Sequence, residues 1–156
     1  MVHARIATSA EQPVNRHAGL AQYAGEEAEL VGVDANGDIV KADADSGVAV
    51  KARGVLMSPV TDLSAVTEEA VSLVTEANRT LMGTHRVSYI EYGVVVENSD
   101  EDWGFTPGDD VYLAAGGGYT QTMPAAVGDL QQIVGYAIDD GEAIVLRVSQ
   151  QHDVAA

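Results

Sequence analysis

The stretch FTPGDDVYLAAGGGYTQTMP, residues 105–124, decides the fold, because it places three consecutive glycines, Gly116 to Gly118, between two segments with the composition of β-strands. A phosphate-binding loop needs a lysine after its last glycine and a helix beyond it. Here Tyr-Thr-Gln-Thr follows Gly118, with no lysine and a strand-like continuation. The dinucleotide-binding fingerprint must also precede a helix. The glycine run is therefore predicted to be the tip of a β-hairpin.

A second hairpin is predicted earlier in the chain. Asn36-Gly37 lies between the strand-like pieces ELVGV and IVKAD, and this dipeptide is the strongest short-range hairpin signal. A shift of 81 residues aligns three glycine pairs without a gap, each pair in the same local role of hairpin tip, loop or mid-strand: Gly37 with Gly118, Gly47 with Gly128, and Gly54 with Gly135. We therefore expect two structurally related hairpin units.

The segment between the two hairpin units has the spacing of a helix. Its apolar residues fall on one helical face, Thr67 is a candidate N-cap, and Gly83 is suited to the C-terminal cap. One inserted α-helix is predicted over about 67–82. Because its apolar face is narrow and made of small residues, we expect it to lie on a sheet.

The segment RVSYIEYGVVVEN, residues 86–98, is rich in β-branched and aromatic residues and is predicted to be one strand, with a bulge or bend at Gly93. On that interpretation one face of the strand carries Ile90, Tyr92, Val94 and Val96. Further strands are expected in QQIVGYAI and EAIVLRV. Short strands separated by turns indicate a mainly β protein, a compact antiparallel sandwich or barrel.

Three regions are expected along the chain. Residues 1–25 show no sustained period and are predicted to form an irregular N-terminal arm. Residues 26–150 form the β-rich domain, and residues 151–156 form a C-terminal tail. A length of 156 residues suits one such domain.

The charge balance excludes several classes of partner. The chain carries 24 acidic residues against 8 lysines and arginines, which gives a formal net charge of −16. Such a surface repels phosphate backbones and anionic membranes, so neither nucleic acid nor membrane is an expected partner. Acids spread along the whole chain, with only two lysines, resemble the surfaces of proteins from salt-loving hosts. An ordinary acidic protein that uses its charge for solubility is the alternative.

Motifs for catalysis or metal binding are missing from the sequence. Asp34, Asn36 and Asp38 have the first ligand spacings of a calcium loop, but Ile39 and Asp45 occupy its essential glycine and glutamate positions. The four histidines are far apart, there is no Gly-x-Ser-x-Gly elbow, and the absence of cysteine excludes a thiolate site or nucleophile. We expect no cofactor, no metal and no enzymatic activity.

Two segments resemble one known family. FTPGDDVYLAAGGGYTQTMPAAVGDLQQIVGYAIDDGEAIVLRV is similar to the C-terminal part of small capsid decoration proteins, also called head cement proteins, of tailed viruses. GEEAELVGVDANGDIVKADADSGVAVKARGVL resembles the earlier half of that family. The matching residues are turn and strand positions: Pro107, Gly108, Asp109, Val111, Tyr112, Gly118, Tyr119, Gly128, Asp129, Gly135 and Gly141.

The resemblance implies a non-enzymatic β protein that assembles as a homotrimer on the outside of a virus head and bridges major capsid subunits. Together with the acidic composition it implies the virion of a tailed virus with a halophilic host, after a stage in the host cytoplasm. Arg5, Arg16 and His17 of the arm are the expected capsid contacts. Another virion component of the tail or spike, or a sandwich-fold carbohydrate-binding or hydrolytic domain, is the alternative.

Overall fold

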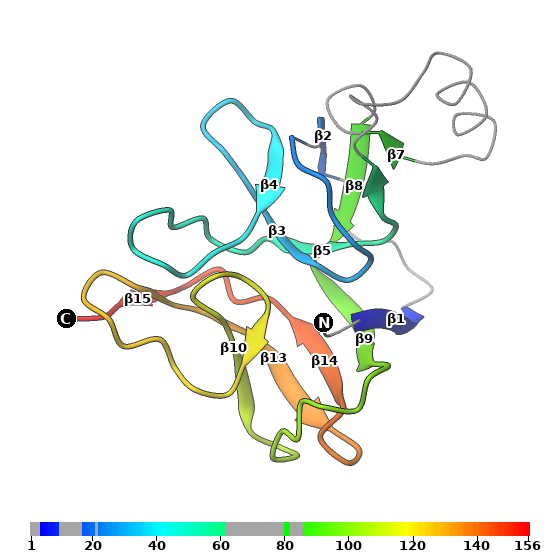
Figure 1. Ribbon diagram of the computed structural model, residues 1–156, viewed down its shortest axis with the longest axis vertical. Coiled ribbons are helices and arrows are strands. Elements are labelled where there is room, and N and C mark those ends of the chain that lie inside the picture. The colour runs from blue at the N-terminus through cyan, green and yellow to red at the C-terminus, as the bar shows by residue number, and fades with distance from the viewer. Residues whose placement is uncertain (1–3, 10–16, 21, 62–79, 82–85) are drawn as a thin grey trace.

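The computed structural model describes residues 4–9, 17–20, 22–61, 80–81 and 86–156. These residues form a mainly β protein with largely antiparallel pairing, and the predicted class is confirmed at that level (Figure 1). The large sheet has six strands in the order β1 (Ala4–Ser9), β9 (Tyr92–Asn98), β14 (Ala143–Arg147), β13 (Ile133–Ile138), β10 (Asp110–Leu113) and β11 (Tyr119–Thr120). The small sheet has five strands in the order β2 (His17–Leu20), β8 (Arg86–Ile90), β5 (Gly54–Leu56), β3 (Leu30–Val33) and β4 (Ile39–Lys41).

The two sheets share one topology. In chain order, β2, β3, β4, β5 and β8 of the small sheet occupy the same relative places as β9, β10, β11, β13 and β14 of the large sheet. All four neighbouring pairs in each set are antiparallel. We call residues 17–90 the N-repeat and residues 92–147 the C-repeat; β1 is an additional edge strand on the C-repeat.

Hydrogen bonds give the register of the two repeats and correct the predicted alignment by one residue. The amide of Gly37 donates to Asp34 O at 3.1 Å, and the amide of Gly117 donates to Ala114 O at 3.0 Å. Gly37 therefore corresponds to Gly117, 80 positions later, and not to Gly118. The C-repeat holds one extra residue beyond this hairpin tip.

The other two predicted glycine pairs agree with the observed register. The turn containing Gly47 closes through Val48 N to Asp45 O, and that containing Gly128 closes through Asp129 N to Ala126 O. Downstream, Val31 pairs with Gly54 as Val111 pairs with Gly135.

The glycine run adopts backbone conformations that other residues rarely take. Gly116, Gly117 and Gly118 have φ values of 89°, 88° and 84°. Three consecutive positive φ angles are accessible to glycine at no steric cost. The run is the turn between β10 and β11, as predicted.

The segment 86–98 does not form one strand. β8 belongs to the small sheet and β9 to the large sheet, and Gly93, with φ of 78°, lies at the start of β9. The chain passes from one sheet to the other at Glu91, and the predicted irregularity at Gly93 is a register shift in the pairing of β9 with β14. Tyr92 is consequently 53% exposed, whereas Ile90 and Val94 are buried, so the expected common face was wrong at Tyr92.

Residues 4–9 and 17–20 of the predicted irregular arm are strands. β1 pairs with β9 and β2 pairs with β8, both antiparallel. The predicted helix lies mostly outside the described residues. Its last part is β7 (Thr80–Leu81), which pairs in parallel with β6 (Val60–Thr61), so those two residues correct the helical prediction. The remaining short pair joins β12 (Leu130–Gln131) to β15 (Asp153–Val154).

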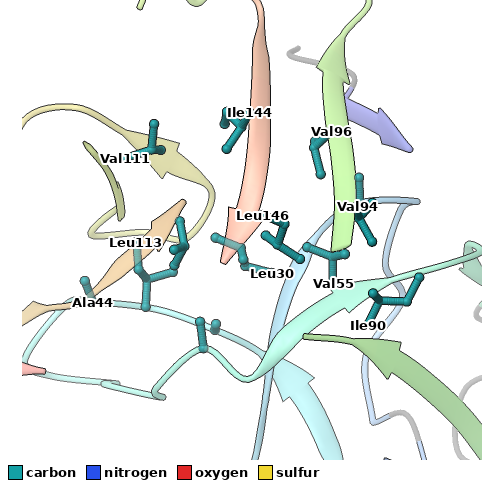
Figure 2. Close-up of a cluster of buried hydrophobic side chains, with 14 of the residues drawn as sticks. Leu30, Ala44, Val55, Ile90, Val94, Val96, Val111, Leu113, Ile144 and Leu146 are labelled. Atoms are coloured by element: carbon teal, nitrogen blue, oxygen red, sulfur yellow. The ribbon is translucent and has the colours of Figure 1, made fainter. Parts of the chain in front are cut away.

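One hydrophobic core joins the two repeats. Figure 2 shows Leu30, Val55 and Ile90 of the small sheet close to side chains of the large sheet, which include Val94, Val96, Ile144 and Leu146. All seven are nearly inaccessible to solvent. A second cluster, made of Val31, Ile39, Leu56, Val60, Val87 and Tyr89, lies within the N-repeat and includes Val60 of β6. Burial of the first cluster, to which both sheets contribute, fixes how the two repeats pack together.

Candidate functional site: a groove between the two repeats

A groove of about 520 Å³ lies where the two repeats meet. The N-repeat contributes the loop before β3 and the end of β4, and the C-repeat contributes a half-buried tryptophan and the glycine hairpin. Its lining consists of Ala4, Ala24, Glu26, Glu27, Ala28, Glu29, Leu30, Lys41, Trp103, Gly117, Gly118 and Tyr119. Both repeats therefore contribute to the groove, and β1 adds Ala4.

The acidic wall is the loop that leads into β3. Ala28 has a φ of 65°, and the Glu29 carboxylate accepts a hydrogen bond from Glu26 N at 3.0 Å, so the loop folds back on itself. The Ala28 amide donates to Leu56 O at 2.9 Å and ties the loop to β5. Glu26 is exposed and Glu27 is half-buried beside it. The wall is thus rigid at its backbone and negative at its rim.

The aromatic wall centres on Trp103. Its ring stacks on Phe105 with centroids 5.2 Å apart, and it meets Tyr119 at 5.3 Å with tilted planes. The Glu142 carboxylate accepts hydrogen bonds from Trp103 N at 2.9 Å and from Gly104 N at 2.6 Å. These charge-assisted bonds hold the loop that presents the indole.

Tyr119 connects the two walls. Its hydroxyl donates to Ala28 O at 2.6 Å, across the junction of the repeats. Burial raises the pKa of Tyr119 well above its ordinary value, and the nearby Glu29 carboxylate and Tyr23 raise it further. The hydroxyl therefore stays protonated and remains a hydrogen-bond donor at neutral pH.

The glycine hairpin docks directly on the N-repeat. Gly116 N donates to Asp43 Oδ1 at 2.7 Å. A Cβ on Gly117 would overlap the Lys41 side chain and lie 3.0 Å from Ala42 O. The run that resembled a phosphate loop therefore serves as a close contact between repeats.

The sequence-predicted positions of the hairpin units fall mainly on turns and strands. Gly118 and Tyr119 line the groove, whereas the others do not. Asp129 is buried and its carboxylate accepts from Ser46 N at 3.1 Å, which links equivalent turns of the two repeats. The remaining positions lie in the turn before β10, in β10, in the turn before β12 or in β13: Pro107, Gly108, Asp109, Tyr112, Gly128 and Gly135.

The expected capsid-contact residues are placed only in part. Arg5 lies in β1 of the large sheet and His17 begins β2 of the small sheet, so the two belong to different sheets. Arg16 lies outside the described residues.

The groove was not predicted from the sequence. Trp103 beside acidic residues was the one available signal, but Glu26, Glu27 and Lys41 come near it only through packing of the repeats. In the described ranges no three histidines or carboxylates are placed to hold a metal ion. The described residues also contain no helix long and apolar enough to cross a membrane. No protein-family model, no curated protein and no solved structure matches the chain.

Proposed function

We propose that this chain is a structural protein of a tailed-virus head, which binds the outside of the capsid as a homotrimer and stabilises it by bridging major capsid subunits. On this proposal it is not an enzyme, and it resides in the virion of a virus with a halophilic host. A cement of this kind works by multivalency, because several weak contacts to neighbouring subunits combine into one strong attachment.

The proposal rests on the structural role of the residues that resemble the decoration family, which is to form turns and close strand contacts. Gly108, Gly118, Gly128 and Gly141 all have positive φ, and Gly135 lies where a Cβ would overlap Val145 O. The residues that carry the resemblance thus set turns and strand contacts of a compact β unit. This role is the one expected of a structural protein and needs no reactive side chain.

The test mixes the purified protein with undecorated virus heads at high and low salt and measures the copies bound per capsid. We expect saturable binding with a stoichiometry divisible by three and heads that survive heating better when decorated. Binding to tails, or absence of saturation on heads, would remove the proposal in favour of a tail or spike component.

The capsid contacts are tested by substitution. Deletion of residues 1–25 would remove β1 and β2, one strand from each sheet, and would confuse folding with binding. The triple variant Arg5→Ala, Arg16→Ala, His17→Ala keeps the backbone, and its expected result is weaker head binding with an unchanged melting temperature. A control that removes two positive charges elsewhere, Lys51→Gln with Arg147→Gln, is expected to bind as the unmodified protein does.

A further inference from the structure

The groove combines features that no part of the proposed capsid role requires. We propose that it binds a cationic side chain, a guanidinium or ammonium group, presented by an extended segment of a partner protein. The inference goes beyond the proposed function, because it concerns the chemistry of this groove and holds for any partner that carries such a segment.

The charge of the lining favours a cation. Three glutamates, Glu26, Glu27 and Glu29, face one lysine, Lys41, so the groove is negative within a chain of net charge −16. A concave surface lined by one sign of charge concentrates oppositely charged ligands. The carboxylates of Glu26, which is exposed, and Glu27, which is half-buried, are assigned to the incoming group.

The aromatic wall supplies the second, independent feature. Trp103 is the single tryptophan of the chain, and one side of its ring is covered by Phe105. Trp103 and Tyr119, whose rings meet at a tilt, both line the groove. A cation over an aromatic face is attracted by the ring quadrupole, most strongly by tryptophan, and arginine is the residue that most often makes this contact. Carboxylates and an indole in one groove therefore suit a guanidinium group.

The width of the groove suits a side chain more than a folded surface. A volume of about 520 Å³ accommodates one or two extended residues. Gly118 also lines the groove, and a Cβ there would meet no atom within 4 Å, so a backbone can approach at this position. Ala28 O is already occupied by the Tyr119 hydroxyl, so recognition falls to the carboxylates and the ring.

The test uses the fluorescence of Trp103, which reports on the groove without a label. The protein is titrated with a blocked tetra-arginine peptide in about 0.15 M salt, where charges more than about 8 Å apart are largely screened. We expect a saturable change in emission. Cellotetraose is titrated in parallel, because a tryptophan with carboxylates can also suit a sugar; a response to cellotetraose without a response to tetra-arginine would overturn the proposal.

Matched variants separate the groove from the general negative field. Glu26→Gln with Glu27→Gln is expected to weaken tetra-arginine binding roughly tenfold, the effect of two surface ion pairs. Asp139→Asn with Asp153→Asn removes the same charge from exposed residues outside the groove and is expected to leave the affinity within about threefold. Equal weakening in the two pairs would mean that only the overall field attracts the peptide, and the proposal would fail.

Two single substitutions act in opposite directions. Lys41→Gln removes the positive charge from the groove, so tetra-arginine should bind several-fold more tightly. Trp103→Phe removes the best cation–π partner and should weaken binding several-fold, as measured by titration calorimetry because the fluorescent reporter is lost. Unchanged affinity in both variants would place the peptide elsewhere. Thermal melts of all variants establish that each is folded, and head binding is measured separately, so failure here leaves the capsid proposal open.

Discussion

The N-repeat and the C-repeat place different residues at the same left-handed backbone position. The amide of Ala28 donates to Leu56 O at 2.9 Å, and the equivalent amide of Gly108 donates to Ala137 O at 2.8 Å. The φ angles are 65° and 89°. The N-repeat thus holds an alanine in a left-handed conformation that the C-repeat assigns to glycine. Both repeats keep the left-handed backbone conformation at this position, but only the C-repeat has glycine, the residue best suited to it.

The hairpin tips differ in the opposite sense. Gly37 is the one residue of its turn with positive φ, whereas the C-repeat has three, Gly116 to Gly118. A Cβ on Gly37 would meet no atom within 4 Å, but one on Gly117 would overlap Lys41. Contact with the other repeat therefore requires glycine at Gly117, whereas a Cβ on Gly116 or Gly118 would meet no atom within 4 Å and glycine there suits the positive φ. Comparison of the two repeats therefore distinguishes the positive φ that the hairpin turn requires from the absence of a Cβ that the contact between repeats requires.

The largest effect is expected where both repeats require glycine for close strand approach. A Cβ on Gly54 would overlap Ile90 O, and a Cβ on Gly135 would overlap Val145 O. Gly54→Ala and Gly135→Ala should each lower the free energy of unfolding by about 3 kcal/mol, measured by denaturant titration. Gly47→Ala is the control, because its Cβ would make only a 3.4 Å contact with Asp45 Oδ1. A large loss in one repeat alone would contradict their equivalence at this position.

The next largest effect is expected at Gln132, whose side chain joins the C-repeat to the N-repeat by hydrogen bonds. Gln132 is fully buried; its amide oxygen accepts from Ala52 N at 2.8 Å, and its amide nitrogen donates to Ala52 O at 2.8 Å and to Ser149 O at 2.7 Å. Gln132→Leu leaves these backbone groups without partners, so we expect a loss of roughly 2 to 3 kcal/mol. Gln121→Leu, whose partners are exposed, should cost less than half as much. Equal losses would show that Gln132 does not join the repeats.

A reciprocal exchange tests the left-handed position itself. Gly108→Ala should destabilise the protein by about 1 kcal/mol, because its Cβ would meet no atom within 4 Å and the cost comes from the backbone conformation alone. Ala28→Gly should change the free energy of unfolding by less than about 1 kcal/mol, because relief of backbone strain is offset by the loss of a fully buried methyl group and by the greater flexibility of glycine in the unfolded chain. Thermal and denaturant unfolding measure both. A loss in Ala28→Gly much larger than that in Gly108→Ala would mean that the two loops are not equivalent.

The smallest effect at neutral pH concerns Tyr119, whose counterpart in the N-repeat is Ile39. Tyr119→Phe removes the hydrogen bond to Ala28 O and should lower the free energy of unfolding by about 1 kcal/mol.

The raised pKa of Tyr119 also makes the stability of the protein depend on pH. The unfolded chain releases the Tyr119 proton near pH 10, whereas the folded protein keeps it. The contribution of Tyr119 to the free energy of unfolding is therefore fully present below pH 10 and falls as the pH rises above it. The variant should lose part of this alkaline sensitivity. Identical pH profiles would count against the assignment; Tyr112→Phe, on a tyrosine outside the groove, is the control.

Much of the local structure could be predicted from the sequence. The glycine run, Asn36-Gly37 and the strands QQIVGYAI and EAIVLRV follow from short-range turn chemistry and alternation, and two of the three predicted glycine pairs agree with the observed register. The Gly37 pairing was wrong by one because the extra residue of the C-repeat lies beyond the tip, where no pattern marks it. The prediction for Tyr92 was wrong because alternation cannot reveal that the chain changes sheets at Glu91.

By itself, then, the sequence determined a mainly β chain of short antiparallel elements with two related hairpins, because backbone conformation at turns and side-chain alternation in strands depend on neighbouring residues. Tertiary structure alone decided that the N-terminal strands join two different sheets, that the repeats share one core, and that Glu27, Lys41 and Trp103 line one groove. The physical reason is that these contacts join residues far apart in the chain. They depend on which apolar faces are buried together, and no local pattern records that choice.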